Sequence, residues 1–196
     1  MTGLCESCGE PFQTDGFIHR CWTCKNIPRE YRYTDELRYL REMADHGIDA
    51  ANIEQALATD KSLYLIGSCG TGKTRIAHVL AKRCHDAGKR VRVLSSHTRP
   101  LADISFGLSL FNQKEWKRDS VLRGLKKPDL LLIDDFGKAK TTESFWALAH
   151  DIIDARASNG RQTIITANNH ILDTAPEHFK ASLVRRIEEF YRVIKF

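Results

Sequence analysis

Runs of apolar residues alternate with amphipathic stretches from residue 62 to the end of the chain. The apolar runs predict five strands, at Leu63–Ile66, Val91–Ser95, Leu130–Asp134, Thr163–Thr166 and Tyr191–Phe196. Helical spacing of apolar residues between them predicts helices at Lys73–Asp86, Glu143–Ala157 and Glu177–Glu189. Residues 96–127 also favour helix, with a less regular pattern. Strands that alternate with helices are typical of a parallel sheet with crossover helices, so the pattern predicts an α/β fold.

The first 61 residues lack this alternation. Residues 1–26 carry four cysteines and too few apolar residues for a core of their own. Residues 27–61 predict a helical connector, because Asp35–Asp45 carries apolar residues at helical spacing and Asn52–Ala58 favours a second short helix. We therefore divide the chain into a small N-terminal module, a connector, and a core over residues 62–196.

The composition suits a folded protein of modest size. Of 196 residues, 42% are hydrophobic and 28% are charged, which allows one α/β domain with a small appendage. No apolar run approaches the roughly 18 residues of a membrane span, and the start lacks the pattern of a secretory signal. We therefore expect a cytoplasmic protein with no membrane partner. The net charge of +5 permits nucleic acid as a partner but does not require it.

A glycine-rich motif follows the first predicted strand and opens the first predicted helix. It reads GSCGTGKT and fits the pattern GxxxxGK[ST]. Its residues are Gly67, Ser68, Cys69, Gly70, Thr71, Gly72, Lys73 and Thr74. Glycines let backbone N–H groups close around a phosphate, Lys73 would reach the β- and γ-phosphates, and Thr74 would bind Mg²⁺. The motif predicts an ATP site, and the alternative is a glycine-rich turn that binds nothing.

A second candidate site element is the strand Leu130–Asp134, which ends in two carboxylates. One carboxylate at such a place can hold the Mg²⁺ shell, and its neighbour can polarise an attacking water. We assign Asp134 to the magnesium and Asp135 to the water. Without the phosphate-binding motif, this pattern would indicate only a strand that enters a turn.

The four N-terminal cysteines form two CxxC pairs. Cys5, Cys8, Cys21 and Cys24 have the spacing C-x₂-C-x₁₂-C-x₂-C, which can place four thiolates around Zn²⁺. We predict a zinc ribbon over residues 1–26, since a segment without a core can fold around a metal. The alternatives are free buried thiols or redox pairs, and His19 could replace one ligand. The ribbon is not strongly basic, which favours docking to a protein over binding to nucleic acid.

The segments GSCGTGKT, LLLIDDFG and TIITANN together resemble AAA+ ATPases, in the branch of bacterial DnaC/DnaI helicase loaders and IstB-type transposition ATPases. The segment IPREYR, at Ile27–Arg32, is similar to the stretch that borders the adenine in that branch. The resemblance covers about residues 25–196. It implies an AAA+ P-loop NTPase core with a five-stranded parallel sheet and, because the chain stops at Phe196, no C-terminal helical lid. AAA+ proteins commonly carry Glu at the position of Asp135.

The resemblance also implies roles for two residues near the C-terminus. Asn168 corresponds to the polar sensor that orients the attacking water, with Asn169 as a competing candidate and a turn-forming Asn as the alternative. Arg186 corresponds to the arginine finger, which acts on the γ-phosphate of a neighbouring subunit and therefore implies a homo-oligomer. The alternative for Arg186 is a solvated helix end.

The segment Asn112–Lys127 is rich in basic residues. Lys114, Lys117 and Arg118 could follow a phosphate backbone, and the interleaved Phe111 and Trp116 could stack on bases. In the resembled family this region faces a central channel and contacts single-stranded DNA. The alternative is a solvated helix whose aromatic residues belong to the core.

Taken together, these features predict an ATPase that uses ATP and Mg²⁺ and carries Zn²⁺. The resemblance implies that it loads or remodels a replicative DNA helicase on single-stranded DNA. The first alternative is an IstB-like transposition helper, and the second is an ATP-binding regulator without turnover. The short length and the zinc ribbon favour a phage or mobile-element protein.

Overall fold

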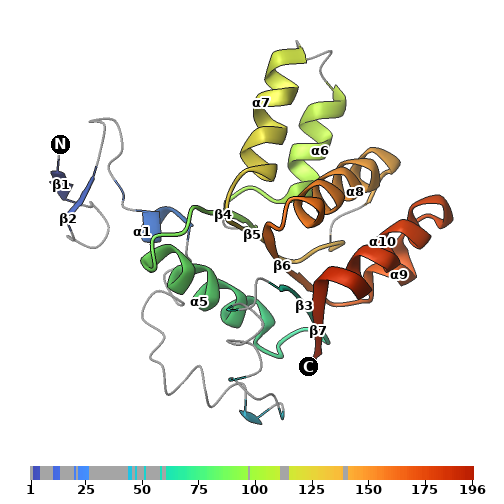
Figure 1. Ribbon diagram of the computed structural model, residues 1–196, viewed down its shortest axis with the longest axis horizontal. Coiled ribbons are helices and arrows are strands. Elements are labelled where there is room, and N and C mark those ends of the chain that lie inside the picture. The colour runs from blue at the N-terminus through green and yellow to red at the C-terminus, as the bar shows by residue number, and fades with distance from the viewer. Residues whose placement is uncertain are drawn as a thin grey trace.

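The computed structural model describes residues 2–4, 11–13, 20, 22–26, 44, 45, 47, 51, 58, 61–96, 98–110, 115–138 and 141–196 (Figure 1). The predicted helices Asp35–Asp45 and Asn52–Ala58 lie almost entirely outside these residues. In the N-terminal module, β1 (Thr2–Leu4) pairs with β2 (Pro11–Gln13) in an antiparallel ladder. A short helix, α1 (Trp22–Asn26), follows.

The core contains a five-stranded sheet in which every neighbouring pair is parallel. Its strands are β3 (Ser62–Ile66), β4 (Val91–Leu94), β5 (Leu130–Ile133), β6 (Gln162–Ala167) and β7 (Tyr191–Lys195). Their order across the sheet is β4-β5-β6-β3-β7. The α/β prediction is therefore confirmed, and each strand lies within one residue of its predicted ends.

Helices cover both faces of this sheet (Figure 1). One face carries α5 (Lys73–Asp86). The other face carries α6 (Leu101–Leu110), α7 (Glu115–Lys126), α8 (Glu143–Ser158) and α10 (Glu177–Phe190), and the short α9 (Ile171–Thr174) precedes α10. The less regular stretch at 96–127 thus contains two helices, α6 and α7.

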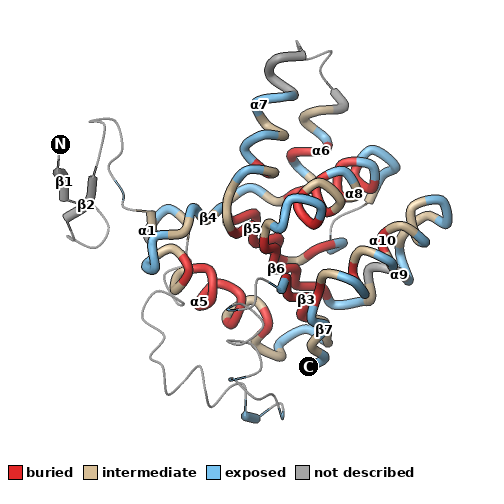
Figure 2. Tube along the Cα trace, in the orientation of Figure 1, coloured by how far each residue is buried: buried red, intermediate tan, exposed pale blue. Residues whose placement is uncertain are grey.

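Alternate residues of each strand build two separate cores, one on each face of the sheet. Leu63 and Leu65 of β3 pack with Ile76 of α5, whereas Tyr64 between them packs with Ile152 of α8. Both faces are apolar because both are covered, as expected for a parallel sheet. Figure 2 shows the strands buried at the centre of the molecule.

The two ends of α5 connect different parts of the chain. Its first residue, Lys73, belongs to the glycine-rich motif, and Gly72 precedes it with a φ of 89°. Near its last turn, His85 stacks on Trp22 of α1, with ring centroids 4.0 Å apart and planes 15° from parallel. Burial lowers the pKa of His85, which favours the neutral imidazole in this stack. The N-terminal module therefore contacts the core through α1 and α5.

Among the described residues, no helix combines the length and the apolar character needed to cross a bilayer.

Candidate nucleotide-binding site

The sheet order brings the predicted site elements to one edge. Strands β5, β6 and β3 are neighbours, so their carboxyl ends lie side by side. The glycine-rich motif follows β3, Asp134 and Asp135 follow β5, and Asn168 follows β6. Ligands of open parallel sheets bind at this edge, where the connections diverge to opposite faces.

The backbone of the glycine-rich motif has the conformation that glycine allows. Gly70 and Gly72 have φ values of 86° and 89°, a region that residues with a Cβ rarely adopt. At Gly67 the limit is space, because a Cβ there would lie 2.6 Å from the carbonyl oxygen of Phe196. The Gly67 N–H donates to the Ala167 carbonyl oxygen at 3.2 Å, which attaches the motif to the end of β6.

Lys73 points its ammonium group into this loop. Its Nζ donates to the Ser68 carbonyl oxygen at 2.6 Å and lies 3.2 Å from Thr71 Oγ1. Burial lowers the pKa of Lys73, while the charges of Cys69, Asp135 and Asp134 act in the opposite direction. A nucleotide phosphate is a stronger partner for the ammonium than a carbonyl oxygen, because the phosphate also carries a full negative charge that attracts the ammonium.

The two predicted magnesium ligands are in direct contact. Thr74 Oγ1 donates to Asp134 Oδ1 at 3.0 Å, and Thr166 Oγ1 donates to the same oxygen at 2.7 Å. His78 Nε2 lies 3.6 Å from Asp134 Oδ2. Burial alone would raise the pKa of Asp134, but the contacts from His78 and Thr166 outweigh it, and the pKa lies below its ordinary value. A hydroxyl and an ionised carboxylate fit Mg²⁺, which prefers hard oxygen ligands.

Asp135 lies at a strained position beside this pair. Its φ of 56° is left-handed, which is uncommon for a residue other than glycine. Its N–H donates to Thr166 Oγ1 at 2.8 Å, and Lys138 Nζ donates to its Oδ2 at 2.8 Å. Backbone strain of this kind persists when surrounding contacts hold it, and it often occurs at functional sites.

A cavity of about 250 Å³ joins Asp135 to the end of β6. It is lined by Asp135, Phe136, Gly137, Lys138, Asn168, Asn169 and Thr174. Asn168 and Asn169 are both exposed, and the Tyr64 hydroxyl donates to the Asn169 carbonyl oxygen at 3.4 Å. The structure thus brings Asn168 and its competitor Asn169 to the carboxylate that is predicted to act on water.

Two residues that sequence analysis did not assign organise these carboxylates. Thr166 contacts both Asp134 and Asp135, and His78 contacts Asp134 from α5. Both side chains are almost completely buried, at 1% exposure. The available signal was a polar side chain inside an otherwise apolar strand or helix face, because buried polar groups generally need partners.

Arg186 contacts its own chain rather than the phosphate loop. Its Nε donates to Asp154 Oδ1 at 2.6 Å, and its guanidinium lies 5.6 Å from the ring centroid of Phe190. Within the part of the chain that the structure describes, its contacts do not include the glycine-rich motif, Asp134 or Asp135. The role of Arg186 as a finger in trans stays a prediction.

The remaining predicted ligands fall largely outside the described residues. Cys5, Cys8, Cys21 and Lys114 lie there, whereas Cys24 belongs to α1, and Lys117 and Arg118 belong to α7. Among the described residues, no group of three or more His, Cys, Asp or Glu side chains could hold a metal ion. The zinc ribbon and the DNA contacts therefore stay predictions.

A family model described as IstB-like ATP binding protein matches residues 36–180. The chain belongs to this family. The IstB-like region therefore includes the glycine-rich motif, both carboxylates and Asn168, and ends before Arg186.

Two curated relatives are similar to part of the chain. An ATP-binding protein in an insertion sequence of Mycobacterium tuberculosis is 30% identical over 112 residues, which cover 57% of this chain and 42% of the relative. The chromosomal replication initiator protein DnaA of Bordetella petrii is 31% identical over 132 residues, which cover 65% of this chain and 25% of DnaA. This IstB-like chain thus spans less than half the length of these relatives.

Solved structures show the same fold. The DnaI structure aligns with a TM-score of 0.61 and 21% identity, covering 86% of this chain and 94% of DnaI. The DnaC helicase loader aligns with a TM-score of 0.60 and 23% identity, covering 74% of this chain and 86% of DnaC. A replication initiator DnaA bound to AMPPCP and single-stranded DNA aligns with a TM-score of 0.59 and 22% identity, covering 74% of this chain and 44% of DnaA. The IstB-like chain therefore has the AAA+ P-loop fold, and its resemblance to DnaC, DnaI and IstB proteins is confirmed.

Proposed function

We propose that this protein is a Mg²⁺-dependent ATPase whose turnover drives the assembly of a partner protein on DNA. The observation that carries the proposal is the contact of Thr74 with Asp134, which joins the phosphate loop to an ionised carboxylate at the carboxyl edge. Membership of the IstB-like ATP binding family supports the choice of nucleotide.

The residues of the site have distinct roles in this proposal. Lys73 binds the β- and γ-phosphates, and the loop N–H groups hold them in place. Thr74 and Asp134 would hold Mg²⁺, which would supply positive charge beside the phosphoryl oxygens. Asp135 accepts a hydrogen bond from the attacking water and polarises it, and Asn168 orients that water from across the shared cavity. Thr166 keeps both carboxylates in register through its contacts with Asp134 and with the backbone of Asp135.

The partner that we propose first is a replicative DNA helicase on single-stranded DNA. The DnaC helicase loader supports this choice, because its fold covers most of both chains. In this proposal ATP binding favours a homo-oligomer around single-stranded DNA, with Lys114, Lys117 and Arg118 facing the strand. Hydrolysis then releases the helicase.

A second candidate is a transposition helper that presents target DNA to a transposase. Two observations favour it: the IstB-like family model and the relative in an insertion sequence. Its nucleotide chemistry is the same, so the partner protein distinguishes the two candidates.

The test of the enzyme is ATP hydrolysis by the purified protein, with and without Mg²⁺ and single-stranded DNA. We expect turnover that requires Mg²⁺ and rises with DNA. Tight ATP binding without turnover under all conditions would contradict the enzyme and favour a regulator that only binds ATP, in which case Asp135 cannot replace the usual Glu. Co-purification with a helicase or with a transposase then separates the two partner proposals.

We also propose that the chain has three parts: a zinc ribbon over residues 1–26, a connector over 27–61 that borders the adenine, and the ATPase core. The contact between Trp22 and His85 supports a ribbon that is docked on the core. Metal analysis should find one Zn²⁺ per chain, held by Cys5, Cys8, Cys21 and Cys24, and a Cys5→Ser and Cys8→Ser double variant should lose it. Protein purified without chelator that contains no zinc would contradict the ribbon.

A further inference from the structure

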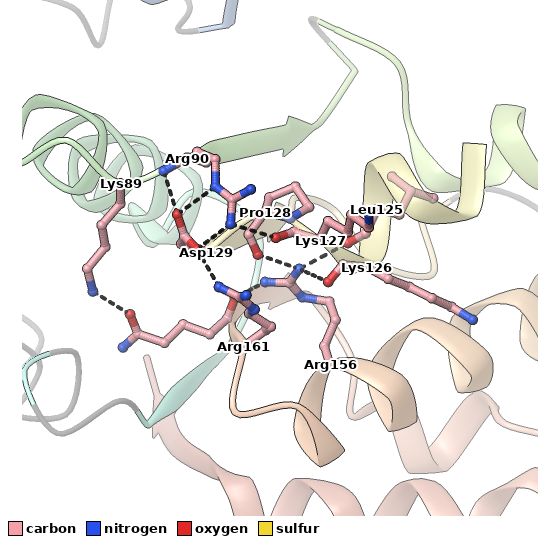
Figure 3. Close-up of polar contacts among 10 residues, drawn as sticks. Lys89, Arg90, Leu125, Lys126, Lys127, Pro128, Asp129, Arg156 and Arg161 are labelled. Atoms are coloured by element: carbon pink, nitrogen blue, oxygen red, sulfur yellow. Dashed lines mark hydrogen bonds and ion pairs between the residues drawn. The ribbon is translucent and has the colours of Figure 1, made fainter. Parts of the chain in front are cut away.

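Cations gather at the amino edge of the sheet, opposite the nucleotide site. Most strands follow a basic residue: Lys61 precedes β3, Lys89 and Arg90 precede β4, Lys126 and Lys127 precede β5, and Arg161 precedes β6. Since β4, β5, β6 and β3 are neighbours in that order, these residues lie along one edge of the sheet. Figure 3 shows the part of this edge around Arg90, Lys127 and Arg161.

A pocket of about 420 Å³ opens at this edge, beside the last turns of α7. It is lined by Arg90, Ser120, Arg123, Gly124, Lys127 and Pro128, three of them cations and none a carboxylate. Arg123 and Lys127 are exposed, and among the described residues neither side chain has a hydrogen-bond or ion-pair partner. Their charges are therefore available to an anion from outside the chain.

Arg156 contacts the carbonyl groups at the end of α7, beside Arg123 and Lys127. Cations in the last turn of a helix ordinarily interact with its free carbonyl groups. Here the fully buried Arg156 takes that place, because its Nη1 donates to the carbonyl oxygens of Leu125, Lys126 and Pro128 at 3.0, 3.3 and 2.9 Å (Figure 3). Burial lowers the pKa of Arg156 to about 10, so it stays charged at neutral pH and adds to the positive potential of this edge.

Asp129, which follows the lining residue Pro128, does not cancel this charge. Asp129 accepts hydrogen bonds from Arg90 Nε at 3.1 Å and from Arg90 Nη2 at 3.0 Å, and Arg161 Nη1 contacts the same carboxylate. The contacts with Arg90 hold the pKa of Asp129 far below its ordinary range. One carboxylate thus faces two guanidinium groups, and the edge keeps an excess of positive charge.

We propose that this amino-edge pocket binds the phosphate backbone of nucleic acid. The guanidinium group of Arg123 has the planar donor geometry that suits phosphate oxygens, Lys127 adds an ammonium group, and Ser120 adds a hydroxyl donor. Gly124 has open space where a Cβ would stand, so a phosphate can approach the helix closely. A row of cations along the edge suits a polymer of phosphates better than a single anion.

The inference rests on the proposed function only in taking nucleic acid as the polyanion. It adds a contact surface that is separated from the ATP site by the length of the strands. On α7 this surface begins within about one turn of Lys117 and Arg118, because Ser120 lines the pocket, and it continues to the end of the helix. DNA could then be held at the amino edge whatever the nucleotide state of the carboxyl edge.

The first test compares two substitutions of Gly124 that differ only in charge. Gly124→Glu places a carboxylate in the pocket, and Gly124→Gln places a neutral amide of the same size there. Both residues favour helix more than glycine and have nearly equal helix propensity, so the pair differs only in charge. We expect Gly124→Glu to weaken binding of labelled DNA at least tenfold at about 50 mM salt, and Gly124→Gln to bind within about threefold of the unsubstituted protein.

The second test removes the two cations without partners. For the Arg123→Ala and Lys127→Ala double variant, we expect the salt dependence of log K to become shallower by about 1.8 for a duplex or about 1.4 for a single strand. The two probes therefore show which form of DNA the pocket contacts. Arg185→Ala with Lys195→Ala is the matched control, because both residues are exposed, Arg185 on α10 and Lys195 at the carboxyl end of β7, away from β4. The Arg123→Lys and Lys127→Arg exchange keeps both charges and should retain binding.

The outcomes separate this inference from the proposed function. Unchanged DNA binding in both Gly124→Glu and the double alanine variant would overturn the inference and leave the ATPase proposal intact. An equal loss in the Arg185 and Lys195 control would also overturn it, since that loss would report net charge only. If the variants retain DNA binding but lose the partner protein in co-purification, the pocket binds an acidic protein surface, and the inference is wrong. If the unsubstituted protein binds no DNA, both the inference and the DNA part of the proposed function fail, while ATP hydrolysis still tests the enzyme.

Discussion

At the carboxyl edge of the sheet, polar side chains converge on a buried carboxylate, whereas at the amino edge a buried guanidinium converges on backbone carbonyl groups. Asp134 receives its hydrogen bonds from Thr74 and Thr166, and Arg156 gives its own to Leu125, Pro128 and their neighbours. Asp134 follows the carboxyl end of β5, and Arg156 contacts Pro128 just before its amino end. Each buried charge is stabilised by polar groups of the opposite polarity.

The difference shows which buried charge is arranged for a ligand. Three contacts around Asp134 come from side chains, and one of them, Thr74, belongs to the phosphate loop. The contacts of Arg156 come mostly from backbone carbonyls that are fixed by the fold. We therefore expect substitutions at the carboxyl edge to change turnover, and substitutions of the buried groups at the amino edge to change stability.

The largest effect should come from Arg186, if the carboxyl edge is incomplete within one chain. Arg186→Ala should bind ATP nearly as before and lose about 10³-fold or more in turnover, because an arginine from a neighbour neutralises charge on the phosphoryl oxygens. Mixing it with Asp135→Asn should restore part of the activity, since some interfaces then pair an intact acidic site with an intact arginine. Arg185→Ala is the control. Turnover per chain that does not depend on protein concentration, with no restoration on mixing, would show that Arg186 only holds Asp154.

The next largest effect should separate binding from turnover within the carboxyl edge. Lys73→Ala should abolish ATP binding because it removes the ammonium from the loop. Asp135→Asn should keep binding and lose about 10²–10³-fold in turnover, since a group that accepts a proton in the transition state contributes about 10²–10⁴-fold. Nucleotide affinity and single-turnover rates measure the two effects. An equal loss of binding in both variants would mean that the two roles are wrongly assigned.

At the amino edge, Arg156→Met should lower the free energy of unfolding by about 3 kcal/mol or more. The substitution leaves several buried carbonyl groups without a donor, and each unsatisfied group costs about 1–3 kcal/mol. Urea denaturation measures the change. Arg161→Met at the same edge is the control and should cost under about 1 kcal/mol, because its contact with Asp129 is partly exposed. A similar small loss in both variants would remove the distinction between the edges.

The smallest effects come from one strand, β6, which carries a threonine near each end. Thr166→Val removes the hydroxyl between Asp134 and Asp135 and should reduce turnover about 10–100-fold with ATP affinity nearly unchanged. Thr163→Val removes the acceptor of Arg156 Nε, 3.0 Å away, and should cost about 1 kcal/mol of stability with normal turnover. Thr166→Ser should retain activity. If both valine variants change the same property, the two edges are not distinct.

Local patterns in the chain accounted for most of the fold and for part of the site. The strands and α5 could be predicted because their signals are local. Each strand is a short run of apolar residues, and α5 has apolar residues at helical spacing with a glycine near each end. The prediction failed to divide residues 96–127 into α6 and α7, because LADISFGLSL carries the apolar Phe106 on its exposed side and gives no clear helical period. Thr166, His78 and Arg156 were not assigned, since their partners come from other elements. On an amphipathic helix, Arg156 has the pattern of a solvated residue, although it is fully buried.

The pairing of β3 has a consequence for synthesis. Leu63 pairs with Ile164 on one side, and Ser62 pairs with Tyr191 on the other. A ribosome adds roughly 5–20 residues per second, so the strand that leads into the phosphate loop waits on the order of 10 seconds for both neighbours. During that time a nascent chain exposes an apolar strand with two unpaired edges, and parallel pairing over long sequence separations is intrinsically slow. Early folding of this protein is therefore the stage at which chaperones and aggregation compete for it.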